Sequence, residues 1–258
     1  MLTSLAVLLA AFSLVWILSL RLRDASIADI WWGPSFVVAS TVYLAVSDGD
    51  PLRRTAVVSA VLLWAARLAW HIGARHQGED ARYRAWRDQH GARWWWFSYF
   101  KVFVLQGVIA WAVSWPLFVA IAAGAPPFPT AWDVAGLALF AVGLAFEAVA
   151  DLQLRRFRAD PARRGTVLDT GLWRYSRHPN YFGEAVLWWG LGLVAAGVPG
   201  GWPALVSPLL LTFLLLRVSG VTLLEAGLSS RKPGYRDYVA RTSAFVPWPP
   251  RRRREPMR

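Results

Sequence analysis

The sequence predicts an all-α integral membrane protein, a bundle of seven transmembrane helices. Three observations predict it. Of the 258 residues, 56% are hydrophobic, and the mean hydropathy is +0.35. Charged residues make up only 17% of the chain, against about 25% in a typical soluble domain. The formal net charge is nevertheless +12, so the charges must be concentrated in short segments between long apolar ones.

Seven apolar segments are long enough to cross a membrane, since a helix needs about 20 residues to span about 30 Å of hydrocarbon. They run approximately over 2–20, 27–46, 55–73, 101–123, 131–150, 182–199 and 203–224. The first segment has no basic residues before it and no small-residue cleavage site after Leu20, so we expect a retained helix rather than a signal peptide. No internal repeat or long polar linker divides the chain, which predicts a single membrane domain over 1–258.

The basic residues predict the orientation of these helices. The loops after the first, third and fifth segments, together with the C-terminal segment, hold 24 of the 28 Lys and Arg residues, whereas the opposite loops hold only Arg53 and Arg54. By the positive-inside rule, the N-terminus lies outside and the C-terminus in the cytoplasm, which requires an odd number of spans. Topology therefore explains the net charge, and no nucleic-acid partner is expected.

Ionisable side chains within the spans are candidates for function, because each costs about 2.5–3.5 kcal/mol to insert. They are Asp29, Arg67, Glu147, Asp151, Glu184, Arg217 and Glu225. Most lie in the predicted cytoplasmic halves, which favours a polar cavity open to the cytoplasm. The simpler alternative is a set of salt bridges between helices that only sets their register.

The loop from Arg155 to His178 carries seven arginines and is followed by Asn180. Arginines beside buried carboxylates suit a nucleotide cofactor, because guanidinium groups bind phosphates while carboxylates accept from ribose hydroxyls or a carboxamide. The chain has no Walker A loop and no glycine-rich loop between a strand and a helix. It has no cysteine and no zinc-like histidine spacing, so no metal site is expected.

Three linked motifs carry a family resemblance. The segment Gly171–Glu184 (GLWRYSRHPNYFGE), the segment Glu147–Gln153 followed by Arg155 and Arg158, and the segment from Glu225 to Trp248 resemble the signatures of bacterial membrane proteins of the steroid 5-alpha-reductase family. The resemblance covers the C-terminal 110 residues most strongly. It extends more weakly to Asp29–Gly33, Arg67–His71 and Gly78–Tyr83.

The resemblance implies NADPH bound in the cytoplasmic half of the bundle and a lipophilic enone, a 3-oxo-Δ4 steroid or sterol-like lipid, that enters from the bilayer. Residues 1–123 would form the substrate side, 131–248 the cofactor side and 249–258 a basic tail. The cofactor residues implied by matching motifs, with their neighbours, are Asp151, Arg155, Arg158, Arg174, Arg177, His178, Asn180, Glu184, Arg217, Glu225, Tyr235 and Tyr238.

The catalytic group is where this sequence departs from the family. The resemblance implies a glutamate and a tyrosine from the early helices that hold the substrate ketone, but the third span, 55–73, contains no tyrosine. Hydride delivery to an enone builds negative charge on the carbonyl oxygen, and a proton donor stabilises it. We expect Asp29 to be that donor, with Arg67 or Tyr83 assisting.

Two other functions remain open. The RHPxY pattern also occurs in membrane isoprenylcysteine carboxyl methyltransferases, which use S-adenosylmethionine, and a small transporter or lipid-binding bundle is a non-enzymatic alternative. We expect a monomer in contact with membrane lipid, in a bacterial inner membrane.

Overall fold

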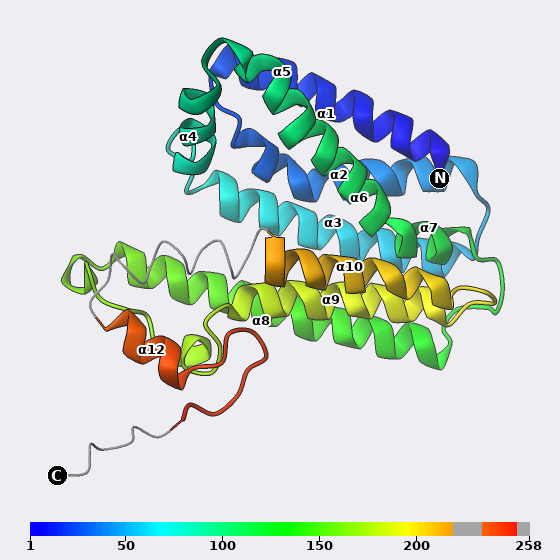
Figure 1. Ribbon diagram of the computed structural model, residues 1–258. Coiled ribbons are helices and arrows are strands. Elements are labelled where there is room, and N and C mark those ends of the chain that lie inside the picture. Colours follow the sequence, from blue (N-terminus) through cyan, green and yellow to red (C-terminus); the bar gives the residue numbers. More distant parts are fainter. Residues whose placement is uncertain (219–233, 252–258) are drawn as a thin grey trace. The chain divides into compact units, whose positions relative to one another are not determined.

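The computed structural model describes residues 1–218 and 234–251 (Figure 1). Within these ranges every regular element is a helix, and a single isolated bridge pairs Ser176 with Ser243. Helices occupy all seven expected segments, the last one as far as Val218. In the described part, four helical stretches are long and apolar enough to cross a membrane: Leu2–Leu22, Pro51–Gly73, Ala81–Val113 and Ala131–Ala159. The helical class is therefore confirmed, while the seven-span count and the orientation remain predictions.

The chain forms two compact groups of residues. Unit 1 comprises 1–134 and 191–207, and unit 2 comprises 135–190 and the residues from 208 onward. Each unit is described by itself below.

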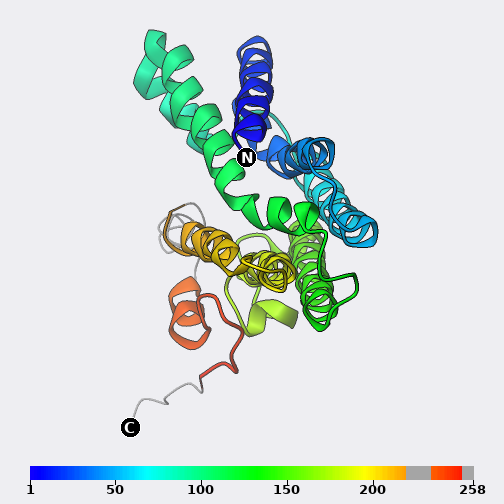
Figure 2. The same ribbon diagram turned by 90° about the vertical axis from the view of Figure 1, so that its right-hand side faces the viewer.

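Unit 1 begins with three helices that run back and forth: α1 (Leu2–Leu22), α2 (Ile27–Val46) and α3 (Pro51–Gly73). Helix α2 packs between α1 and α3 (Figures 1 and 2). Helix α3 begins where the sequence provides a cap, since the Asp50 side chain accepts from the backbone N–H groups of Leu52 and Arg53, and Pro51 occupies the first helical position.

The second half of unit 1 starts with α4 (Ala81–His90), which Asp80 caps and Gly91 ends. Gly91 has φ +47°, a conformation that costs glycine little. A 3₁₀ turn, η1 (Gly91–Arg93), leads to α5 (Trp94–Ser98), the π-helical segment η2 (Tyr99–Val104), α6 (Leu105–Val113) and α7 (Trp115–Ala122). The chain therefore changes direction at Gly91, between a polar helix and an apolar one.

Unit 2 is organised around α8 (Ala131–Ala159) and α9 (Pro179–Ala196). Glycines allow these two helices to approach closely: a Cβ on Gly143 would lie 2.4 Å from the Leu187 nitrogen, and one on Gly183 would lie 2.5 Å from the Glu147 nitrogen. Small residues at such contacts permit backbone-to-backbone packing. The close approach brings Glu147 of α8 next to Gly183, the residue that precedes Glu184 in α9.

The remaining described elements are short. They are η3 (Pro161–Arg163), η4 (Gly171–Arg174), η5 (Trp202–Leu205), α10 (Val206–Phe213), the π-helical η6 (Leu214–Val218) and α12 (Tyr235–Arg241).

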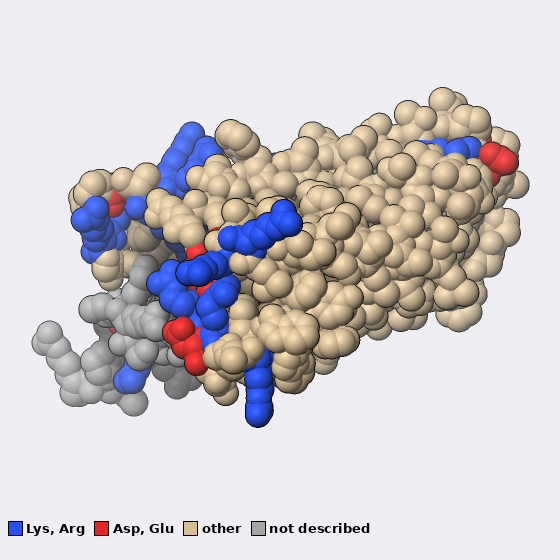
Figure 3. Space-filling model, turned by 90° about the horizontal axis from the view of Figure 1, so that it is seen from above, with Lys and Arg blue, Asp and Glu red and all other residues tan. Residues whose placement is uncertain are grey.

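The flanks of the helices are apolar and exposed. Leu14, Leu18, Leu63, Val108 and Val142 are examples of large hydrophobic side chains that face outward. Figure 3 shows, on one face, that Lys, Arg, Asp and Glu gather near helix ends while the long flanks carry almost no charge. Extended apolar flanks of this kind are typical of surfaces that contact lipid.

Candidate functional site

Asp29 is held by two side chains from α4. It lies in the first turn of α2, and its Oδ1 accepts a hydrogen bond of 2.7 Å from the Tyr83 hydroxyl. Its Oδ2 accepts from Arg82 Nη2 at 3.1 Å. Tyr83 is buried, and the Arg82 guanidinium lies 5.5 Å from the centre of its ring. A carboxylate, a phenol and a guanidinium thus meet at the starts of two helices.

The position of α4 depends on its N-cap, Asp80. The Asp80 Oδ1 accepts from the Arg82 backbone N–H and from Arg82 Nε, both at 2.9 Å. Partial burial raises the pKa of Asp80, but these hydrogen bonds and the positive charge of Arg82 outweigh it and hold that pKa below its usual value. Arg82 therefore bridges an ionised cap at residue 80 and the carboxyl group of Asp29.

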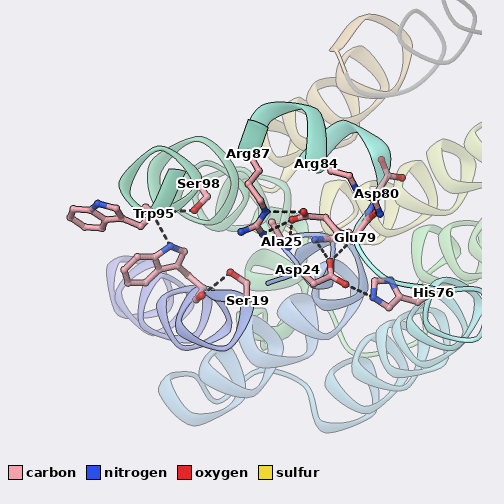
Figure 4. Close-up of polar contacts among 12 residues, drawn as sticks. Ser19, Asp24, Ala25, His76, Glu79, Asp80, Arg84, Arg87, Trp95 and Ser98 are labelled. Carbon is pink, nitrogen blue, oxygen red and sulfur yellow. Dashed lines mark hydrogen bonds and ion pairs between the residues drawn. The ribbon is translucent and has the colours of Figure 1, made fainter. Parts of the chain in front are cut away.

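A second set of contacts ties the turn before α2 to the loop before α4 (Figure 4). Asp24 Oδ1 accepts from both the backbone and the hydroxyl of Ser26, and its Oδ2 lies 2.7 Å from His76 Nε2. The Ser26 hydroxyl oxygen accepts from the Asp80 N–H at 3.0 Å. These contacts hold the two helix starts that carry Asp29 and Tyr83.

Glu79 reinforces the same connection. Its Oε1 accepts from the Ala25 N–H at 2.9 Å, and Arg87 donates to both of its carboxylate oxygens, at 2.7 and 2.9 Å (Figure 4). Such a bidentate pair has well-defined geometry. The Arg87 guanidinium also lies 5.1 Å from the centre of the Trp94 ring, which connects α4 to α5.

The structure brings together two of the three predicted catalytic residues, Asp29 and Tyr83. Arg67 lies half-buried on α3, one turn before His71. Arg82 was not among the predicted site residues, although the sequence carries a signal for it: Asp80 is a good N-cap residue, and a helix starting there places Arg82 and Tyr83 together in its first turn. The catalytic roles themselves remain predictions.

In unit 2, Asn180 and Asp151 form a direct contact. Asn180 Nδ2 donates to Asp151 Oδ1 at 3.2 Å, which joins α8 to the first turn of α9. Asp151, Glu147 and Glu184 are all buried. Carboxyl and amide groups from both helices therefore share one buried region, which the glycine contacts between α8 and α9 help to create.

The loop Gly171–His178 is held against the C-terminal segment by hydrogen bonds to that segment's backbone. The Arg177 N–H donates to the Ser243 carbonyl at 2.9 Å, and the Ser176 hydroxyl donates to the Phe245 carbonyl at 2.7 Å. The Trp248 N–H donates to the Tyr175 carbonyl at 2.9 Å. Two motifs that lie about 70 residues apart in the sequence thus form one structure.

The same loop is also fastened to α8. Gln153 Oε1 accepts from the Leu172 N–H at 3.0 Å, and Trp173 Nε1 donates to the Ala150 carbonyl at 3.1 Å. Gly171 is required here, because its φ is +61° and a Cβ would lie 2.6 Å from Gln153 Nε2.

Two predicted cofactor residues have structural contacts with the backbone. Arg177 Nη1 donates to the carbonyls of Val239 (3.0 Å) and Thr242 (2.6 Å), at the end of α12. The Tyr238 hydroxyl donates to the carbonyls of Trp173 and Ser176. Burial raises the pKa of Tyr238, so it is a neutral donor at physiological pH. These residues hold the loop against α12.

The other predicted cofactor residues fall into two groups. Exposed arginines lie at the end of α8, in η4 and in η6: Arg155, Arg158, Arg174 and Arg217. His178 and Tyr235 are buried, and the His178 ring is parallel to that of Tyr181 at 5.7 Å. Glu225 lies outside the described residues. In the described part of the chain, no group of three or more His, Asp and Glu side chains could hold a metal ion.

The fold has apolar outer flanks and, in each unit, a polar cluster near helix ends, which are features of the class of helical membrane proteins. The chain belongs to the family described as "Protein of unknown function (DUF1295)", whose sequence profile matches residues 15–242. This family includes steroid 5-alpha-reductase-like membrane proteins.

Among curated proteins, the chain is similar to an uncharacterized protein of Schizosaccharomyces pombe. The two are 26% identical over 270 residues, which covers 91% of this chain and 76% of the relative. No solved structure matches the chain significantly.

Proposed function

We propose that this protein is an NADPH-dependent membrane reductase, which reduces a carbon–carbon double bond conjugated to a ketone in a lipophilic substrate such as a 3-oxo-Δ4 steroid or sterol-like lipid. The observation that carries the proposal is the 2.7 Å hydrogen bond between Tyr83 and Asp29. The family that the sequence resembles holds the ketone with a carboxylic acid and a tyrosine. Here the tyrosine that α3 lacks comes from the first turn of α4.

These residues suit the chemistry of carbonyl polarisation. When bound, NADPH supplies the hydride that forms the new C–H bond at the β-carbon. Asp29, in its protonated form, gives its proton to the carbonyl oxygen, where negative charge develops, and this produces an enol that tautomerises to the saturated ketone. The Tyr83 hydroxyl and Arg82 then stabilise the negative charge left on Asp29, which recovers a proton from water.

The side chains of unit 2 fit the chemical groups of NADPH. Exposed guanidinium groups at Arg155, Arg158 and Arg174 suit its phosphates. The hydrogen-bonded pair Asp151–Asn180, with the buried Glu184, suits ribose hydroxyls and the carboxamide. Arg177, Tyr238 and His178 would support the loop that carries Arg174. The assignments of Arg217, Tyr235 and Glu225 rest on the family resemblance.

The first experiment measures cofactor binding to the purified protein as a rise in its melting temperature. We expect NADPH to raise the melting temperature, because a ligand that binds only the folded state stabilises it. NADH should have a smaller effect at the same concentration, since it lacks the 2′-phosphate. A rise with S-adenosylmethionine and none with NADPH would refute the proposal in favour of a methyltransferase.

The second experiment measures NADPH oxidation with a panel of 3-oxo-Δ4 steroids and other lipophilic enones. We expect Tyr83→Phe and Asp29→Asn to keep the NADPH-induced rise in melting temperature and to lose turnover. Arg155→Gln should weaken the NADPH effect. Asp48→Asn, at a fully exposed side chain, is the matched control and should change neither. Full turnover in both Tyr83→Phe and Asp29→Asn would remove the pair from catalysis.

A further inference from the structure

The short helix α5 and the first turn of η2 together present two different aromatic faces. Trp94 is buried and lies under the Arg87 guanidinium. Trp95, Trp96 and Phe100, in contrast, are 57%, 43% and 59% exposed. We call these three side chains the α5 aromatic face. It is flanked by the exposed basic residues Arg93 and Lys101.

The length of the following helices places α5 at a membrane boundary. After Lys101, the 21 residues from Val102 to Ala122 carry no charge. At 1.5 Å per helical residue they extend over about 32 Å, which matches the hydrocarbon thickness of about 30 Å. Lys101 therefore lies at the edge of the hydrocarbon, and α5 precedes it on the headgroup side. Tryptophan is enriched at this depth because its ring is amphipathic.

Other tryptophans of unit 1 lie near both expected boundaries of the membrane. Trp70 is exposed near the end of α3, and Trp16 Nε1 donates to the Trp95 carbonyl at 3.0 Å, so the end of α1 lies beside α5. Trp132 and Trp202 are exposed at the opposite end of unit 1. Asp133, next to Trp132, pairs with Arg53 near the start of α3. The turn η5, which begins at Trp202, packs against α7.

We infer that the α5 aromatic face, with Arg93 and Lys101, binds the headgroup layer of the bilayer and selects anionic phospholipid. The indole rings lie among the headgroups, and the two cations contact lipid phosphates. Helix α4, which is polar and separated from α5 by the turn at Gly91, lies on the water side. This interaction surface is independent of the proposed reductase activity.

Because the chain contains no cysteine, a single introduced cysteine can be labelled at a chosen position, and the depth of that position in the bilayer can be measured. Trp95→Cys, Val108→Cys and Arg84→Cys are each labelled with an environment-sensitive fluorophore in phospholipid vesicles, and the emission is quenched by lipids spin-labelled at known depths or by iodide in water. We expect the label at position 95 to be quenched best by a headgroup spin label. The label at 108 should respond to a deep acyl-chain spin label, and the label at 84 to iodide.

A label at position 95 that is quenched like the one at 108, or like the one at 84, would overturn the inference. Trp96→Cys provides a second reading at the same depth if the Trp95→Cys protein does not fold.

The preference for anionic lipid is tested by the association of spin-labelled phosphatidylglycerol relative to spin-labelled phosphatidylcholine. Each basic residue near a charged surface contributes about fivefold in affinity, so Lys101→Gln and Arg93→Gln should each reduce the relative association by up to about that factor. Arg54→Gln is the matched control and should have little effect on lipid association, because the Arg54 guanidinium already donates through Nη2 to the Leu44 carbonyl. No loss in either test variant, or equal competition by inorganic phosphate, would refute lipid binding at this surface.

Discussion

The buried ion pair between Arg53 and Asp133 provides the sharpest test of how unit 1 is held together. The two side chains are 0% and 1% exposed, and Arg53 Nε and Nη2 donate to the two Asp133 oxygens at 2.8 and 2.9 Å. Arg53 Nη2 also donates to the Pro126 carbonyl at 2.8 Å. The pair thus connects the first turn of α3, the loop before α8 and the start of α8.

We predict that Arg53→Met lowers the free energy of unfolding by about 3–5 kcal/mol, because it leaves a buried carboxylate without its counter-charge. The lower part of this range is expected, since Asp133 Oδ2 keeps hydrogen bonds from the backbone and hydroxyl of Thr130 at 2.8 and 2.9 Å. Equilibrium unfolding in mixed micelles, followed by tryptophan emission, measures the change.

The double variant Arg53→Met/Asp133→Leu should recover most of the lost stability, because it removes the unpaired charge as well. Arg54→Met is the matched control: Arg54 lies 3.9 Å from the exposed Asp48, and such a pair contributes at most about 1 kcal/mol. The reasoning is refuted if Arg53→Met costs no more than Arg54→Met, or if the double variant is less stable than the single one.

Three further predictions concern packing, pH and the loop of unit 2. Gly183→Ala should destabilise the protein by about 1–3 kcal/mol through overpacking, whereas Gly73→Ala, where a Cβ meets nothing within 4 Å, should not; unfolding in micelles compares them. Because the pKa of Asp80 is lowered in the folded state, its pairing with Arg82 stabilises the protein above the unfolded pKa of about 3.9, and this contribution disappears as the pH falls through the folded pKa. Asp80→Asn should therefore be less stable than wild type at neutral pH, by less than about 1 kcal/mol because the pair is partly exposed. The difference should vanish in strong acid, and a difference that stays constant with pH would contradict this prediction. Tyr238→Phe removes the donor to two loop carbonyls, so trypsin should cleave the 171–178 loop faster than in wild type, and an unchanged rate would show that the backbone contacts suffice.

The candidate site was only partly predictable. Asp29, Asp151 and Glu184 could be selected from the sequence because a charged residue within an apolar helix is costly wherever it points. Their partners could not be selected in the same way. Arg177 was assigned to cofactor phosphates from its place in an arginine-rich loop, yet its guanidinium donates to backbone carbonyls at the end of α12. That contact depends on how a distant segment folds back.

The sequence by itself determined where the long apolar helices lie, because a chain in lipid must satisfy its backbone hydrogen bonds within each apolar run, and charged residues separate those runs. It also determined which residues are candidates for function. Only the tertiary structure decided which of them meet: Tyr83 reaches Asp29 across 54 positions, and the glycines of α8 and α9 place Asp151 beside Asn180. Helical periodicity describes one helix at a time, whereas these contacts depend on the packing of side chains between helices, which no local pattern records.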